Sequence, residues 1–422
     1  MKIMVVGGGG REHAIIKCLR KNKDITEIYA LPGNGGMTGD AVCVNIGAKD
    51  IEEQVKFAVE NSIDYAVIAQ DDPLALGAVD ALLKVGITAF GPSAKAAEIE
   101  SSKVFSKDLM KKYNIPTAEY EVFDNSADAL RYLETAKIPI VVKADGLALG
   151  KGVTVAMTRE EAVNAVKHAM EDRVFGASGE KIVIEEYLEG PEVSVLSFTD
   201  GKVVKPMVSS MDHKRARDND EGLNTGGMGT VAPNPFYTKE IADVCMETIF
   251  LPTIRAMEEE GRTFKGCLYF GLMLTRNGPK VIEYNCRFGD PETQVVLPLL
   301  RSDLFTVMKA TTDGTLAETE VLWSDGAAAC VVMASDGYPA SYRKGFEITM
   351  SEAAKEFTYC AGVKEENGKL YTDGGRVLGV TATADNLKDA LKKAYERVSE
   401  VSFENAYYRK DIGKRALSAL EA

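Results

Sequence analysis

The clearest chemical pattern in this chain is the alternating row formed by Glu283, Asn285 and Arg287. In a β-strand, side chains point alternately to opposite faces, so these three side chains share one face. Proteins hold Mg²⁺ through one or two carboxylates together with substrate phosphates, and arginine can clamp phosphoryl oxygens. The row therefore predicts a metal and polyphosphate site. A solvated sheet face with a Glu–Arg contact is the alternative.

Residues 7–10 are four glycines between an apolar run and a helical stretch. Backbone N–H groups and the helix dipole favour an anion at such a helix start. The third glycine of the dinucleotide-binding pattern is missing, and the next strand ends without an acid for a ribose, which disfavours NAD. Because Arg11 opposes the helix dipole, it fits better beside a phosphate. A tight turn with an exposed arginine is the alternative.

Residues 143–152 form a second glycine-rich segment, with lysines near both ends. It departs from the Walker A pattern, because three residues separate Gly146 from Gly150 and a glycine follows Lys151. It also joins a strand to a strand. We expect a flap that covers a polyphosphate, with a plain hairpin tip as the alternative.

Residues 212–229 are charged and rich in glycine, and by themselves they indicate a solvent-exposed loop. His213 lies in this loop and is a weak candidate for a catalytic base. The seven cysteines contain no CxxC pair and have no convincing histidine partner. This pattern disfavours zinc binding and a thiol nucleophile, and it favours reduced thiols in the cytoplasm.

The composition is that of an ordinary globular protein of several domains. The chain has 422 residues, a net charge of −13, 45% hydrophobic and 27% charged residues, and one core rarely exceeds about 300 residues. A pI near 5 disfavours nucleic-acid and anionic-membrane partners. No apolar run approaches the ~20 residues of a membrane span, and the N-terminal apolar stretch is too short for a signal peptide.

The order of expected elements indicates a mixed α/β and α+β protein. Strands alternate with helices through the first hundred residues, including a helix expected over residues 76–84, which predicts a parallel sheet covered by helices. After residue 103, antiparallel hairpins dominate, and a smaller unit begins after residue 322. The expected strand pairs are 140–144 with 153–157, 193–199 with 203–209, and 269–275 with 280–286. The third pair turns at Asn277-Gly278, a strong hairpin signal. A helix after the first pair opens with Thr158 and Glu161 at the spacing of a capping box.

Taken together, these segments resemble the phosphoribosylamine–glycine ligases of the ATP-grasp superfamily. The matching motifs run through the whole chain in the right order: GGGGREHA (7–14), KADGLALGKGV (143–153), DHKR (212–215), NTGGMG (224–229) and EYNCRFGDPETQ (283–294). The chain departs from the usual pattern at residues 69–74, where Asp71 replaces a glutamate, and at residues 360–363.

The resemblance implies an ATP-grasp fold with an N-terminal Rossmann-like domain and a small C-terminal domain. It implies a Rossmann-like domain at 1–102, a central domain at 103–122 and 194–325, a lid at 123–193, and a C-terminal domain at 326–422. The implied reaction joins glycine to 5-phosphoribosylamine with ATP, through glycyl phosphate, in purine synthesis. We expect no nucleic-acid or membrane partner, and a monomer, with a dimer as the alternative.

The resemblance also assigns site residues. Metal ligands for Mg²⁺ or Mn²⁺ are Glu283 and Asn285, and catalytic groups are Arg287, Lys214 and Asp212. ATP is held by Lys103, Lys143, Gly146, Gly150, Lys151, Gly152, Glu185, Glu186, Tyr187, Leu188 and Glu192. The glycine and amine substrates contact Asn224, Thr225, Gly226 and Gly227, and the 5′-phosphoribosyl group contacts Gly9, Gly10, Arg11, Gly33, Asn34 and Asp71.

Two other functions stay open at this point. Another ATP-grasp carboxylate ligase, such as a carboxylase of purine or biotin metabolism, would share Glu283 and the flap but lack DHKR and NTGGMG. A nucleotide-binding regulatory protein without turnover would agree with the altered residues 69–74.

Overall fold

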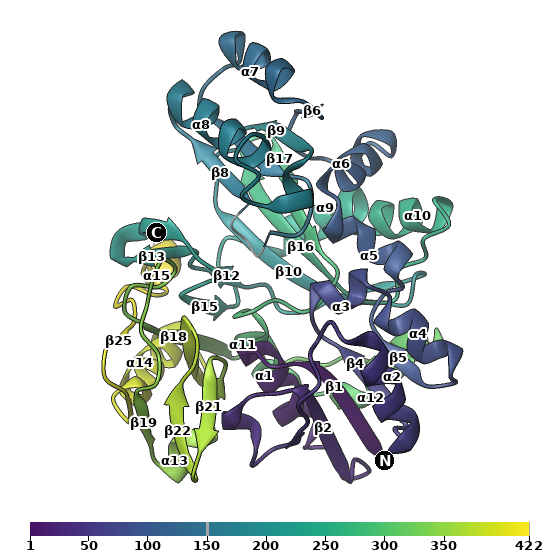
Figure 1. Ribbon diagram of the computed structural model, residues 1–422, viewed down its shortest axis with the longest axis vertical. Helices are drawn as coiled ribbons and strands as arrows, with labels where there is room; N and C mark the ends of the chain where they lie inside the picture. Colours follow the sequence, from purple (N-terminus) through teal and green to yellow (C-terminus); the bar gives the residue numbers. More distant parts are fainter. Residues whose placement is uncertain (149–151, 422) are drawn as a thin grey trace.

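The computed structural model describes residues 1–148 and 152–421. The first unit is a parallel sheet in the order β3-β2-β1-β4-β5, with helices packed on it (Figure 1). Its apolar strands are buried, as expected for a sheet covered on both faces. The strands are β1 (Lys2–Gly7), β2 (Glu27–Pro32), β3 (Val42–Cys43), β4 (Tyr65–Ile68) and β5 (Thr88–Phe90), and the helices are α1 (Gly10–Leu19), α2 (Ile51–Glu60), α3 (Asp71–Ala75), α4 (Ala78–Lys84) and α5 (Ala94–Ser101).

The second unit is the lid at the top of Figure 1, an antiparallel sheet in the order β6-β9-β7-β8. Helix α8 begins with the predicted capping box, in which Thr158 and Glu161 satisfy each other's backbone N–H groups. Helix α6 (Lys103–Lys112) leads into this unit, which contains β6 (Tyr120–Phe123), α7 (Ser126–Thr135), β7 (Ile140–Ala144), β8 (Val153–Ala156), α8 (Arg159–Met170) and β9 (Ile182–Glu186).

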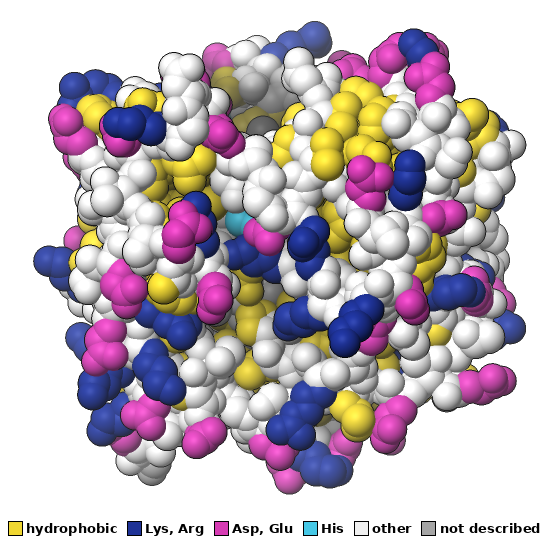
Figure 2. Space-filling view, turned by 90° about the horizontal axis from the view of Figure 1, so that it is seen from below, with side chains coloured by type: hydrophobic (Ala, Val, Ile, Leu, Met, Phe, Trp, Pro, Cys, Tyr) yellow, Lys and Arg dark blue, Asp and Glu magenta, His cyan; other side chains and the backbone are white. Residues whose placement is uncertain are grey.

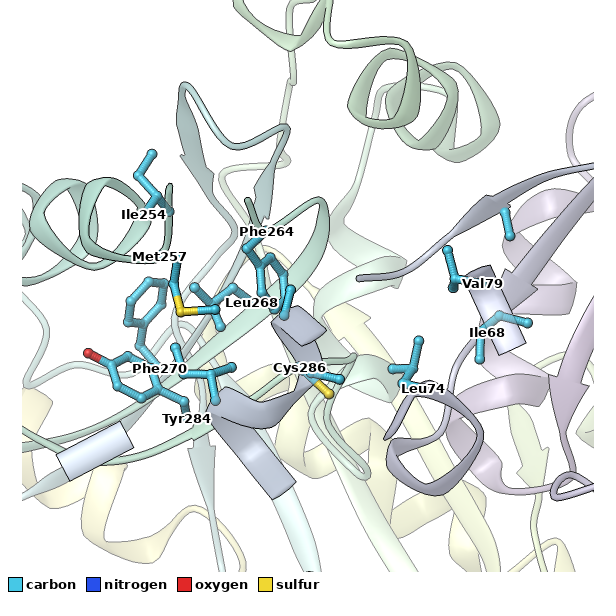
Figure 3. Packing of buried hydrophobic residues seen from close by; sticks show 14 of the residues in the cluster. Ile68, Leu74, Val79, Ile254, Met257, Phe264, Leu268, Phe270, Tyr284 and Cys286 are labelled. Atoms are coloured by element: carbon cyan, nitrogen blue, oxygen red, sulfur yellow. The ribbon is translucent and has the colours of Figure 1, made fainter. Parts of the chain in front are cut away.

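The central sheet has the order β11-β10-β16-β17 and lies between the lid and the first unit (Figure 1). The strongest hairpin signal in the sequence, Asn277-Gly278, turns β16 into β17 as expected. Buried aromatic side chains fill the space between this sheet and helix α10 (Figure 3). The elements are β10 (Glu192–Thr199), β11 (Val204–Pro206), α9 (Lys239–Cys245), α10 (Leu251–Glu259), β16 (Gly266–Thr275), β17 (Gly278–Asn285), α11 (Thr293–Val296) and α12 (Leu304–Asp313).

The C-terminal sheet has the order β12-β15-β18-β23-β20, with β25 paired to β18. Its first two strands come from the charged loop region, about a hundred residues before β18, so one sheet joins two parts of the chain. The strands are β12 (Met211–Asp212), β15 (Gly229–Ala232), β18 (Ala327–Ser335), β20 (Thr358–Cys360), β23 (Arg376–Ala384) and β25 (Ala406–Tyr407). The helices of this region are α13 (Glu352–Lys355), α14 (Leu387–Val398) and α15 (Lys414–Glu421).

Two smaller pairings complete the fold. The order β21-β22-β19-β24 packs beside the C-terminal sheet, and β13 pairs with β14 inside the charged loop region. These strands are β13 (Arg215–Arg217), β14 (Glu221–Asn224), β19 (Glu347–Met350), β21 (Val363–Glu366), β22 (Lys369–Thr372) and β24 (Val401–Ser402).

All three predicted hairpins form, in antiparallel register. The helix expected over residues 76–84 is wrong in its start: Gly77 has a φ of +85°, so the helix breaks there, and a separate helix α3 already begins at Asp71. Within the parts that the structure describes, every helix is too short or too polar to cross a membrane. On the face in Figure 2, acidic and basic side chains are intermixed.

Two buried histidines connect the units through both of their ring nitrogens. Nδ1 of His13 in α1 accepts from the Cys360 N–H at 2.8 Å, so its Nε2–H faces Asp40 at 2.9 Å. Nε2 of His213 accepts from the Gly413 N–H at 3.0 Å, so its Nδ1–H donates to the Gly229 carbonyl at 3.0 Å. His213 is therefore a structural residue and not a catalytic base.

We expect Phe270→Ala to destabilise the central unit. Phe270 is fully buried, 4.2 Å from the Phe250 ring and 5.7 Å from the Tyr284 ring between centroids. Truncating such a side chain costs about 3–5 kcal/mol of unfolding free energy. The melting temperature measures the effect, and Leu223→Ala, at an exposed position, is the control that should change it little.

Acid should weaken the fold through His213. Burial lowers the pKa of His213 to about 4, whereas the unfolded chain has a pKa near 6.5. Between those values the unfolded state binds a proton that the folded state does not, so stability falls as the pH falls. Melting temperatures at about pH 7.5 and about pH 5 should therefore differ less in His213→Asn than in the unsubstituted protein. Equal differences would contradict this assignment.

Candidate active site

The lid lysine and the predicted metal-binding strand lie side by side. The Nζ of Lys143, near the end of lid strand β7, donates to the carbonyl of Ile282 in β17 at 3.0 Å. Glu283 follows directly in the same strand, and its carboxylate lies 3.7 Å from the Nζ of Lys214. Three separate segments of the chain thus bring Lys143, Lys214 and Glu283 together.

Glu283 is held in its ionised form by the cations around it. Burial by itself would raise the pKa of Glu283, but Lys214, Lys143, Lys103 and Arg287 outweigh it and the pKa is lowered. Burial also lowers the pKa of Lys103, which Glu283 opposes. An ionised carboxylate surrounded by cations is suited to a site where a metal ion and an anionic phosphate chain meet.

Arg287 is oriented by a buried carboxylate on α5. Its Nη2 lies 2.8 Å from Glu100 Oε1 and donates to Asn285 Oδ1 at 3.2 Å. The other oxygen of Glu100 accepts from the Cys286 N–H at 2.7 Å. The guanidinium is thereby fixed beside Asn285, although Arg287 itself lies two residues beyond the end of β17.

Cations and carboxylates alternate in the lid above the cleft. Glu185 Oε2 lies 3.0 Å from Lys143 Nζ and 3.1 Å from Lys107 Nζ, and all three side chains are buried. Glu185 Oε1 is buried and has no hydrogen-bond partner among the described residues. Glu186 pairs with Lys280 at 2.7 Å, so β9 is fastened to β17. Tyr187 and Leu188 continue from the end of β9 toward Glu192.

The base of the predicted flap depends on close backbone approach. A Cβ at Gly146 would lie 2.5 Å from Ser178 Oγ, so only glycine fits without a shift. The Nζ of Lys103 donates to the Gly146 carbonyl at 3.1 Å. Gly152 follows at the start of the return strand, where its carbonyl accepts from the Ala144 N–H at 2.8 Å. Gly150 and Lys151 lie outside the described residues.

The charged loop is an ordered wall of the same cleft. Lys214 Nζ lies 3.4 Å from Glu192 Oε2, and its backbone carbonyl accepts from the N–H and hydroxyl of Thr225, each at 2.8 Å. Glu192 and Glu283 raise the pKa of Lys214 well above its usual value, against burial. Burial and the neighbouring carboxylate of Glu292 raise the pKa of Asp212 well above its usual value.

The glycines that end this loop are held from the C-terminal sheet. Nη1 of Arg376 donates to the Gly226 carbonyl at 2.7 Å and to the Asp290 carbonyl at 2.8 Å. Gly227 donates to the Thr225 hydroxyl at 2.9 Å. Asn224 ends β14 and so stands at the entrance to this turn.

The first glycine loop faces the segment that follows Arg287. Arg11 is buried, its Nε lies 2.6 Å from Glu12 Oε1, and its Nη1 donates to the Phe288 carbonyl at 3.1 Å. A Cβ at Gly10 would lie 2.6 Å from Gln294 Nε2. The alternative interpretation, a turn with an exposed arginine, is therefore wrong. The loop packs against the segment that follows Arg287.

Neighbouring residues complete this wall. The Asn34 amide donates to the carbonyls of Gly8 and Cys360, each at 2.8 Å, so its side chain fastens the loop to the C-terminal unit. Gly33 has a φ of +66°, which glycine adopts without strain. Burial alone would raise the pKa of Asp71, but Arg287 and Arg11 lower it, which places Asp71 in their joint field.

Sequence reasoning missed several residues of the site. Lys107, Glu100 and Arg376 contact the predicted site residues Glu185, Arg287 and Gly226 respectively. Lys107, Glu100 and Glu292 are buried. A charged residue on an otherwise apolar helix face was the available signal for Glu100. Glu292 accepts from the Tyr269 hydroxyl at 3.1 Å, an arrangement that needs the fold to be seen.

No three histidine, cysteine or acidic side chains gather into a metal-binding group within residues 1–148 and 152–421. Glu283 and Asn285 offer one carboxylate and one amide oxygen, which fits a hard cation whose remaining ligands are phosphate oxygens or water. A site for zinc, with its nitrogen and sulfur ligands, does not fit these residues.

Three family models match consecutive parts of the chain. They describe phosphoribosylglycinamide synthetase: its N domain at residues 1–100, its ATP-grasp (A) domain at 101–293 and its C domain at 328–415. The phosphoribosylamine–glycine ligase of Clostridium acetobutylicum is 48% identical over 414 residues, which is 98% of this chain and 100% of that protein. The enzyme of that name from Caldanaerobacter subterraneus is 47% identical over 413 residues, which is 98% of this chain and 99% of that protein.

Solved structures agree. The crystal structure of phosphoribosylamine–glycine ligase from Thermotoga maritima matches with a TM-score of 0.85 and 34% identity over 98% of this chain and 100% of that one. The biotin carboxylase domain of the Hydrogenobacter thermophilus 2-oxoglutarate carboxylase, with MgADP and bicarbonate, has a TM-score of 0.74 at 17% identity over 96% of this chain and 91% of that one, which shows a shared fold alone. The expected ATP-grasp fold is confirmed, and the chain belongs to the phosphoribosylamine–glycine ligase family.

Proposed function

We propose that this chain joins glycine to 5-phosphoribosylamine with ATP, forming glycinamide ribonucleotide, ADP and phosphate. The observation that carries the proposal is the hydrogen bond from Lys143 to the Glu283 strand, since it joins the lid to the central sheet beside Glu283. We also propose the division into 1–102, 103–122 with 194–325, 123–193 and 326–422, in which strands β12 and β15 of the second part complete the sheet of the last part. We further propose a monomer in the cytoplasm.

The nucleotide lies between lid and central sheet in this proposal. Lys103 and Lys143 contact the phosphates, the flap from Gly146 to Gly152 covers them, and the backbone at residues 186–188 holds adenine. Glu185 borders the adenine pocket and Glu192 the ribose. Glu283 and Asn285 hold Mg²⁺ or Mn²⁺, which when bound neutralises phosphate charge.

The reaction needs an activated carboxylate, because oxide is a poor leaving group. A glycine carboxylate oxygen attacks the γ-phosphorus, the bond to the β–γ bridging oxygen breaks, and ADP leaves. The amine of phosphoribosylamine then attacks the carbonyl carbon of glycyl phosphate, the C–O bond to phosphate breaks, and the amine loses a proton. Arg287 stabilises charge on the transferring group. The closed lid excludes water that would hydrolyse the intermediate.

The substrates occupy the other two walls. Asp212 and Lys214, with residues 224–227, line the glycine and amine sites, where Lys214 can attract a carboxylate. The loop containing Gly9, Gly10 and Arg11, together with Gly33 and Asn34, binds the 5′-phosphate, and Asp71 faces the ribose. The chemistry of a helix N-terminus supports an anion here, and the cation pair of Arg11 and Arg287 near Asp71 supports it further.

ADP formation should require both glycine and freshly generated phosphoribosylamine. Coupled detection of ADP, with omission of each substrate in turn, checks this dependence. ADP release driven equally well by bicarbonate would instead favour a carboxylase. Tight ATP binding without turnover on any acid and amine would favour a regulatory protein.

Glu283→Ala should lower kcat by about 1000-fold, because it removes the carboxylate ligand and several kcal/mol of transition-state stabilisation. The variant should remain folded at the assay temperature, although the uncompensated cations lower its melting temperature, and it should lose most of its response to added Mg²⁺. The matched control is Glu366→Ala, an exposed glutamate of β21 paired with Lys364, which should leave kcat unchanged. Normal turnover in Glu283→Ala would refute the metal assignment.

A further inference from the structure

A short segment near the end of the chain, residues 409–413, is hydrogen-bonded to the charged loop at residues 212–229. Arg409 is 1% exposed, the largest of the fully buried side chains among the described residues. Its Nη1 donates to the carbonyl of Arg215 at 3.1 Å and lies 2.9 Å from Asp220 Oδ1. Both acceptors lie in the loop, almost 200 residues earlier in the chain.

Further contacts link the same two segments. The carboxylate of Asp411 accepts hydrogen bonds from Arg409 Nε at 2.8 Å and Nη2 at 2.9 Å. It also accepts one from the Asn219 N–H at 2.8 Å. The Lys410 N–H donates to Asp218 at 2.8 Å. Gly413 reaches His213 through the hydrogen bond described above. Figure 1 shows β13 beside helix α15, which directly follows the residues that make these contacts.

These hydrogen bonds hold the two residues that precede and follow Lys214 in the sequence. His213 is held through its ring and Arg215 through its carbonyl. Lys214 itself points the other way, to Glu192 and Glu283. A backbone fixed on both sides of one lysine restricts where its Nζ can lie, and a displacement of 1 Å can cost a reaction about 100-fold.

Burying a guanidinium costs desolvation free energy, and well-packed apolar residues in the place of a buried ion pair would often stabilise a fold as much as the pair does. Arg409 nevertheless supplies hydrogen bonds in a fixed fork, which neither an apolar side chain nor lysine can reproduce. Its acceptors sit on a hairpin with left-handed backbone at Asn219 and Asp220. Arg409 and Asp411 contact this hairpin at Arg215, Asn219 and Asp220.

We propose that Arg409 is a positioning residue for the ligase reaction: together with Asp411 it fixes the loop at 213–221 so that Lys214 faces the substrate cleft. The proposal rests on the proposed function, since it concerns the same glycine and amine sites. It assigns to the C-terminal unit a part in catalysis without contact to any substrate.

Arg409→Lys tests this role because it keeps the charge and loses the fork. We expect kcat/KM for glycine to fall about tenfold or more, while binding of a non-hydrolysable ATP analogue with Mg²⁺ changes by less than about twofold. Asp220→Asn removes the charge from the exposed partner and tolerates the left-handed backbone. It should shift kcat/KM in the same direction without lowering the melting temperature.

The control is Arg397→Lys on α14, an arginine that donates to the Thr381 carbonyl and stacks on Phe357 within the C-terminal unit. It should leave KM for both substrates unchanged. The proposal is overturned if Arg409→Lys and Asp220→Asn keep the unsubstituted kcat/KM per folded molecule, even where Arg409→Lys melts earlier. If the unsubstituted enzyme itself forms no product from glycine and phosphoribosylamine, the proposed function has failed instead.

Discussion

Charge balance inside one cleft is the constraint on which this structure depends. Lys103, Lys143, Lys214 and Arg287 converge on Glu283, and like charges at such distances repel strongly in a low dielectric. Interior carboxylates at Glu185 and Glu100 offset part of this repulsion. In the proposed function, a bound nucleotide phosphate chain would add further negative charge beside these cations.

This balance explains why so many side chains of one unit contact another unit. The lid contributes Lys143, the central sheet Glu283, and the charged loop Lys214, and none of these segments is close to another in sequence. Arg11 reaches the Phe288 carbonyl from the first unit, and Arg376 reaches Asp290 from the C-terminal sheet. The segment after Arg287 is therefore the place where three units meet, and its geometry is fixed from several directions at once.

The sequence predicted what depends on local pattern. The period of two in the strand from residue 281 to 287 placed Glu283, Asn285 and Arg287 on one face, and Asn277-Gly278 predicted the hairpin before them. Glu100 could not be predicted as the partner of Arg287, because 187 residues separate them and only the tertiary fold brings them together. Arg11 was expected to bind a phosphate, and in the structure it contacts Glu12 and the Phe288 carbonyl. No local sequence signal could predict the contact with Phe288. The roles of the individual side chains toward substrates stay predictions.

The pairing of β15 with β18 has a consequence for the modular history of the chain. A fragment cut just before β18 would leave that strand with a long, apolar and unpaired edge, because its neighbour belongs to the preceding part. Exposed edges of this kind recruit other chains and aggregate. A fragment meant to contain the complete C-terminal sheet therefore has to include residues 211–232. A domain boundary drawn by sequence order alone would separate strands that are hydrogen-bonded to one another.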